Sequence, residues 1–114
     1  MNQAQLKTFT NYVKKWRDTF GLMSWEISVE RDEFDIDIVA RTDFDVNNRF
    51  ALIRFNNDYT DNLSNDNLNR TALHEVLEIL FATMRRMGEQ QFAFDVVDRC
   101  VHKLIRTFEN VLLK

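Results

Sequence analysis

Residues 73–81 read LHEVLEILF, and this stretch predicts an amphipathic helix. Its apolar residues recur at three- and four-residue spacing, as they do on a helix with one buried face. With His74 placed at 0° on a helical wheel, the apolar residues fill an arc of roughly 200° to 340°. Glu78 falls at roughly 40°, so the pair lies at the margin of the buried stripe. The stripe consists of Leu73, Val76, Leu77, Leu80, Phe81 and Met84.

The sequence before this helix predicts one helix followed by short strands. Residues 3–20 carry apolar side chains at helical spacing, and Gly21 is suited to end that helix. Three strand-like runs follow, Trp25–Glu30, Phe34–Ala40 and Phe50–Phe55. Alternation of apolar and polar residues in short segments favours a small antiparallel sheet of about three strands.

The sequence after the strands predicts two helices. An Asn- and Asp-rich loop leads to Ser64, Asn65 or Asp66, any of which can cap a helix at residues 66–87. Gly88 is predicted to interrupt it, and a last helix is expected at residues 90–112. The order of elements indicates an α+β fold, and the absence of an internal repeat or boundary indicates a single domain over residues 1–114.

Composition excludes several classes of function. The chain of 114 residues has a formal net charge of −3, which gives no support for binding nucleic acid. A single cysteine excludes an internal disulfide framework and suits a reducing compartment. The N-terminal residues show no continuous apolar stretch, so we expect neither a signal peptide nor a membrane span. These features predict a cytoplasmic protein, and they leave its oligomeric state open.

The chain's two histidines both fall beside apolar stripes. His74 and Glu78 are four residues apart, which puts their side chains one turn apart on one helical face. His102 lies roughly 60° beyond Ile105, at the edge of the stripe of the last helix. If the two stripes pack together, His102 faces His74 and Glu78. Two imidazoles and one carboxylate form a known catalytic zinc set with one position left for water.

Two acidic neighbours have predicted roles beside this set. Glu75 lies roughly 100° around from His74, off the line of the ligands. In H-E-x-x-H helices this residue is the general base, so Glu75 is the candidate catalytic residue. Asp98 precedes His102 by four residues and is positioned to orient its imidazole. An ordinary surface contact between His74 and Glu78 is the competing interpretation. We expect structural ion pairs, and no catalytic role, for four further charged residues, Arg54, Arg85, Arg106 and Glu109.

Two separated motifs give the chain a family resemblance. It resembles the small zinc metallopeptidases of tailed bacteriophages and prophages, which have a zincin-like fold. Glu78 stands where that family has a histidine, and Val101 stands where it has an acidic residue. The matching segments are Trp25–Ile27, Ala51–Asn56, Leu68–Glu78 and Val101–Leu112, the last reading VHKLIRTFENVL.

The resemblance implies a minimal zincin-like domain that binds Zn²⁺ and hydrolyses peptide bonds in the cytoplasm of a bacterial host. His74 and His102 match the family's first and downstream ligands, and Glu75 matches its base. We expect the run Phe50–Phe55 to line the cleft as an edge strand that holds an extended peptide. Two alternatives remain open: a catalytically inactive phage accessory protein that uses this fold to bind a host or phage protein, and a metal hydrolase with a different substrate.

Overall fold

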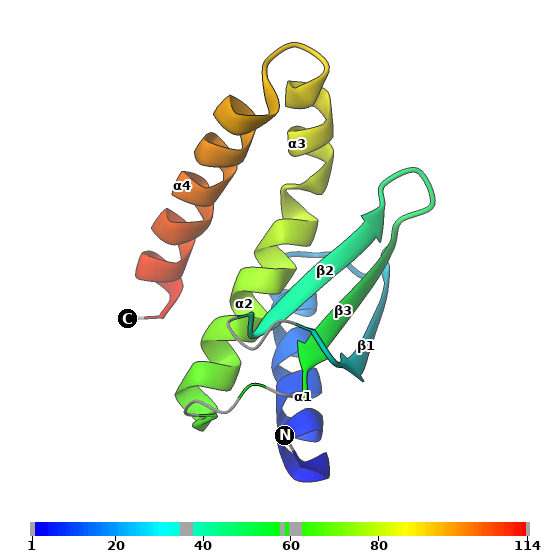
Figure 1. Ribbon diagram of the computed structural model, residues 1–114, viewed down its shortest axis with the longest axis vertical. Helices are drawn as coiled ribbons and strands as arrows, with labels where there is room; N and C mark the ends of the chain where they lie inside the picture. Colours follow the sequence, from blue (N-terminus) through cyan, green and yellow to red (C-terminus); the bar gives the residue numbers. More distant parts are fainter. Residues whose placement is uncertain (1, 35–37, 58, 60–62, 114) are drawn as a thin grey trace.

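The computed structural model describes residues 2–34, 38–57, 59 and 63–113, and these form an α+β fold. The helix predicted from LHEVLEILF lies between the sheet and the C-terminal helix (Figure 1). In chain order the elements are α1 (Gln3–Thr19), β1 (Glu26–Asp32), β2 (Ala40–Asp45), β3 (Phe50–Asn56), α2 (Asn65–Leu80), α3 (Ala82–Glu89) and α4 (Phe94–Leu112).

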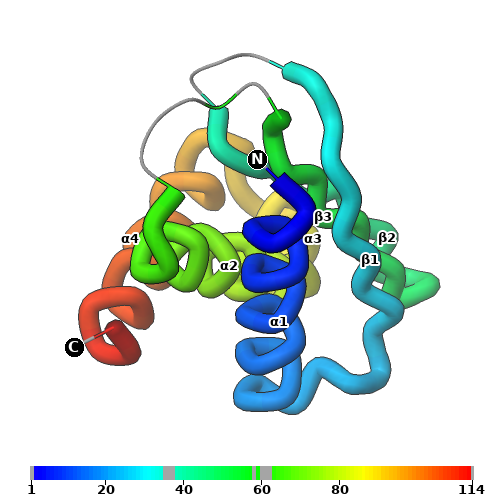
Figure 2. Tube along the Cα trace, turned by 90° about the horizontal axis from the view of Figure 1, so that it is seen from below, coloured from blue at the N-terminus to red at the C-terminus, as the bar shows by residue number. Residues whose placement is uncertain are grey.

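The N-terminal helix α1 begins and ends as the sequence predicted. The Asn2 side chain accepts a hydrogen bond from the Gln5 backbone N–H, and the Gln5 side-chain oxygen accepts one from the Asn2 backbone N–H. Gly21 follows the helix with φ 68°, a conformation that glycine adopts without steric cost. The Trp16 indole N–H donates to the Asn69 side chain at 2.8 Å and ties α1 to α2, which it crosses (Figure 2).

The described residues form three strands, the number predicted, but the sheet is mixed, with order β1-β3-β2. β2 pairs antiparallel with β3, as predicted, whereas β1 pairs parallel with β3, so the prediction of a fully antiparallel sheet was wrong. The reason is that β3 lies between the two strands that precede it in the chain. β3 is the most apolar strand, and its Ala51, Ile53 and Phe55 side chains are fully buried. A strand of this composition is most stable where both edges are paired and one face is covered.

The second strand lies further along the chain than predicted. Of the predicted run Phe34–Ala40, residues 35–37 lie outside the described part of the chain, and β2 runs from Ala40 to Asp45. Alternating burial does occur in β2, but its half-buried residues are Ala40, Thr42 and Phe44, of which only Phe44 is large and apolar. Thr42 faces the buried carboxyl group of Glu75 on α2. An inward-facing position with a polar side chain does not follow the alternation of apolar and polar residues, so the sequence did not predict this strand.

The helix predicted at residues 66–87 is divided in two. Ser64 caps α2, with its hydroxyl accepting from the Asn67 backbone N–H. Phe81 ends α2 and precedes α3, and its ring contacts Phe108 of α4 at a centroid distance of 5.5 Å. This break takes Met84 out of the predicted apolar stripe and leaves it 51% exposed.

Gly88 lies inside α3 rather than ending it. A Cβ at this position would lie 3.2 Å from a Val97 methyl group of α4, which is tighter than ordinary packing. Glycine therefore allows α3 and α4 to approach closely, and the chain reverses after Glu89.

The core is formed where α1, α2 and one face of the sheet meet. Phe9 of α1 and Phe55 of β3 are fully buried and pack edge to face, with ring centroids 4.8 Å apart. Leu73, Val76 and Leu77 on α2 are also fully buried. The apolar residues of LHEVLEILF therefore face the core. This fixes where the polar residues of the same stretch, His74, Glu75 and Glu78, lie around the helix.

Phe9→Ala should lower the free energy of unfolding by about 3–5 kcal/mol, because it removes a fully buried ring from this contact. Phe92→Ala is the matched control, since Phe92 is 65% exposed and should change stability little. Urea unfolding followed by circular dichroism measures both. Equal losses would mean that the Phe9–Phe55 contact does not hold α1 on the sheet.

Candidate metal centre

The structure brings His74, Glu78 and His102 together, as the sequence predicted. Glu78 Oε1 lies 3.8 Å from His74 Nε2 and 3.6 Å from His102 Nε2. One ligand atom from each residue can be chosen so that all three lie within 4.8 Å of one another. The i, i+4 spacing on α2 provides the first pair, and the packing of α4 beside α2 adds the third residue.

Both imidazoles have a carboxylate from α4 beside Nδ1. Glu109 Oε1 lies 3.6 Å from His74 Nδ1, and Asp98 Oδ2 lies 3.3 Å from His102 Nδ1. His102 Nδ1 is also 2.9 Å from the Asp98 backbone carbonyl, which can only accept a hydrogen bond. Nδ1 of His102 therefore carries a hydrogen, and in a neutral ring Nε2, which lies on the side of Glu78, has the free lone pair.

Arg85 of α3 joins the two helices that carry the histidines. Its Nη1 donates to Asp98 Oδ1 at 2.6 Å, and its Nη2 donates to Glu78 Oε2 at 3.3 Å. The side chain of Arg85 is only 12% exposed and that of Glu78 15%. The pKa of Asp98 lies below its ordinary value, chiefly because of the Arg85 hydrogen bond and to a smaller extent because His102 is nearby. Asp98 is thus held as a carboxylate.

Glu75 turns away from the ligands, as predicted, and faces the sheet. Although it is a charged residue type, it is only 6% exposed. The Thr42 hydroxyl of β2 donates to Glu75 Oε2 at 2.7 Å. Burial raises the pKa of Glu75, while the Thr42 hydrogen bond and His74 act in the opposite direction. A buried carboxyl group with a raised pKa beside a cleft is a candidate for a role in proton transfer.

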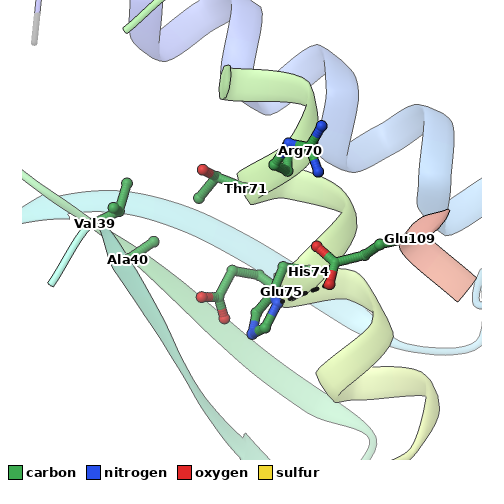
Figure 3. A pocket seen from close by; sticks show the side chains of 7 residues that line it. All are labelled: Val39, Ala40, Arg70, Thr71, His74, Glu75 and Glu109. Atoms are coloured by element: carbon green, nitrogen blue, oxygen red, sulfur yellow. Dashed lines mark ion pairs between the residues drawn. The ribbon is translucent and has the colours of Figure 1, made fainter. Parts of the chain in front are cut away.

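Two cavities adjoin His74 and Glu75. One, of about 300 Å³, has Val39, Ala40, Arg70, Thr71 and Glu109 as its other lining residues (Figure 3). In this view the Glu75 carboxylate points towards Ala40, while Glu109 approaches the His74 ring from the opposite side. The second cavity, of about 270 Å³, is lined by Ala40, Arg41, Thr42, His74, Glu75 and Glu78. Glu75 and two of the candidate ligands therefore border the same space.

The three candidate ligands suit a small divalent cation. Ligands at bonds of about 2.0–2.1 Å in a tetrahedron are roughly 3.3 Å apart. The two Glu78–histidine separations, 3.8 and 3.6 Å, exceed this value only modestly.

The charge around the two histidines suits a cation as well. Glu78, Asp98 and Glu109 with Arg85 leave two negative charges beside the imidazoles when these are neutral. A divalent cation, or protonation of both histidines, would balance that charge.

Arg85 and Glu109 are site residues that the sequence analysis did not assign to the site. The structural ion pairs predicted for them exist, but their partners are Glu78, Asp98 and His74. Spacing gives a signal for both, because Arg85 follows Glu78 and Glu109 follows His102 by seven residues, which is two helical turns. The ion pairs predicted for Arg54 are confirmed on the sheet, with Glu30, Asp32 and Asp43.

Comparison of the chain with protein families, with curated proteins and with solved structures found no match. In the described part of the chain, no helix combines the length and the apolar character needed to cross a membrane.

Protein purified without chelators or a histidine tag should contain about one zinc per chain if His74, Glu78 and His102 form one tetrahedral site with an open position. His74→Ala and His102→Ala should each remove most of it, because two protein ligands rarely retain zinc. Elemental analysis measures the stoichiometry. Full metal content in both variants would mean that the ligand assignment is wrong.

Glu109→Ala should weaken zinc binding roughly 10–100-fold, the usual effect of removing a carboxylate that orients a ligating histidine. Titration against a competing chelator measures this. Glu26→Ala is the control, because Glu26 is an exposed glutamate on β1, at the opposite edge of the sheet from β2. An equal effect of both variants would assign the change to net charge.

Proposed function

We propose that the protein is a zinc-dependent hydrolase of peptide bonds, of the zincin-like type that its motifs resemble. The observation that carries the proposal is the meeting of His74, Glu78 and His102 beside the buried carboxyl group of Glu75. The proposed place of action is the cytoplasm of a bacterial host.

In the proposed mechanism three residues bind the metal and Glu75 transfers the proton. Bound zinc would supply a Lewis acid that polarises the scissile carbonyl and lowers the pKa of water to about 7. His74, Glu78 and His102 would hold the ion. Glu75 would accept the proton of the attacking water and pass it to the leaving amine. Its raised pKa supports this role, and the Thr42 hydrogen bond fixes its orientation.

The proposed peptide site lies along β2 rather than β3. The sequence analysis expected Phe50–Phe55 to be the edge strand, but β3 is paired on both sides and cannot accept a further strand. Within the described residues, β2 forms the sheet edge beside α2, and Ala40 and Thr42 line the second cavity. An extended peptide that pairs with β2 would run past Glu75 and the candidate ligands.

A second candidate function is a non-catalytic phage accessory protein that binds a host or phage protein. One observation favours it. Large apolar side chains are exposed around the turn between α3 and α4, and such exposure is typical of a protein contact surface. They are Met84, Met87, Phe92, Phe94 and Val96.

Glu75→Gln should lower peptidase activity by about 10²–10⁴-fold, the usual contribution of a general base, while zinc content and fold are retained. The amide has nearly the same shape as the carboxyl group but cannot accept the proton. A digest of a peptide library with zinc-loaded wild type and the variant in parallel measures this.

Cleavage by both proteins at the same rate would identify a contaminating peptidase. If neither protein cleaves any peptide although zinc is bound, the accessory-protein function is favoured instead.

A further inference from the structure

Arg85 closes a ring of contacts that contains two of the three candidate ligands. Glu78 Oε2 contacts Arg85 Nη2, and Arg85 Nη1 contacts Asp98 Oδ1. Asp98 Oδ2 contacts His102 Nδ1, and His102 Nε2 faces Glu78 Oε1. Each carboxylate therefore uses one oxygen towards Arg85 and the other towards His102, so the ring fixes the rotation of both carboxylates.

This arrangement leaves Glu78 with a single oxygen for a metal. Oε1 faces both imidazoles, whereas Oε2 is occupied by a guanidinium N–H. A carboxylate bound through one oxygen suits a four-coordinate ion such as zinc. Manganese favours six-coordinate sites made mainly of oxygen atoms. A carboxylate that can bind through both of its oxygens therefore suits manganese better than one that binds through a single oxygen.

We propose that Arg85 is a positioning residue that restricts Glu78 to one ligand oxygen and thereby increases the preference of the site for zinc over manganese. The inference rests on the proposed metal site, and it adds the determinant of metal selectivity. Arg85 itself does not ligate the metal. It acts through Glu78 directly and through Asp98 on His102.

The charge of Arg85 has an effect that must be separated from its geometry. A guanidinium beside a ligand repels any divalent cation, so its removal should strengthen the binding of zinc and manganese alike. The ratio of the zinc affinity to the manganese affinity distinguishes the effect of the charge from the effect of the geometry. Loss of charge changes both affinities by a similar factor, whereas release of Glu78 changes the ratio.

The test measures zinc and manganese affinities of the full chain by chelator competition, for wild type, Arg85→Lys and Arg85→Gln. Lysine keeps the charge but lacks the planar fork that reaches two carboxylates with two separate nitrogens. Both variants should lower the ratio of zinc to manganese affinity roughly tenfold or more, as expected for loss of a group that orients ligands. Arg54→Gln should leave the ratio unchanged, since Arg54 pairs with sheet residues and not with the site.

An unchanged ratio in both variants would overturn the inference while zinc binding by the wild type stands. If Arg85→Gln then binds both metals more tightly by the same factor, with no change in Arg85→Lys, the role of Arg85 is that of its charge alone. If Arg85→Gln does not fold, the ratio in Arg85→Lys decides. Failure of the wild type to bind either metal would instead overturn the metal site, and this inference with it.

Discussion

The burial of α2 is the constraint on which the rest of the structure depends. This helix packs against α1, the sheet and α4, and its Ala72, Leu73, Val76 and Leu77 are fully buried. A helix covered on several sides has few directions left for polar side chains, and each polar group directed inwards needs a partner. The partners come from other elements. Thr42 of β2 bonds to Glu75, Arg85 of α3 to Glu78, and Glu109 of α4 contacts His74.

The polar cluster is consequently an interdependent unit. Glu78 and Arg85 are both largely buried, so removing either leaves a charge without its partner in a poorly solvated place, which costs more than the pair contributes. The excess of negative charge around the two histidines has the same origin. It can be balanced by protons on the imidazoles or by a divalent cation, and these compete because a ligating imidazole must be neutral.

The sheet is coupled to the site through β2. Its register on β3 places Thr42 opposite Ile53, and Ile53 is fully buried. The alternation of a strand then directs Thr42 to the same side as the core, where it meets Glu75. Among the described residues β2 is an edge strand of the sheet, and it also contributes the Thr42 hydroxyl that orients Glu75.

The sequence by itself determined the fold class, the N-terminal helix, the number of strands and the pairing of His74 with Glu78, because each follows from local periodicity or spacing. It also indicated His102 as a partner, because both histidines lie at the margins of apolar stripes that pack together. Only the tertiary structure decided that β3 is central and β1 parallel to it, that Phe81 divides the long helix, and that Arg85 and Glu109 belong to the site. Strand order and ion-pair partners depend on which distant surfaces meet in space. Spacing along the chain can place two residues on one helical face, but it does not identify the partner on another element.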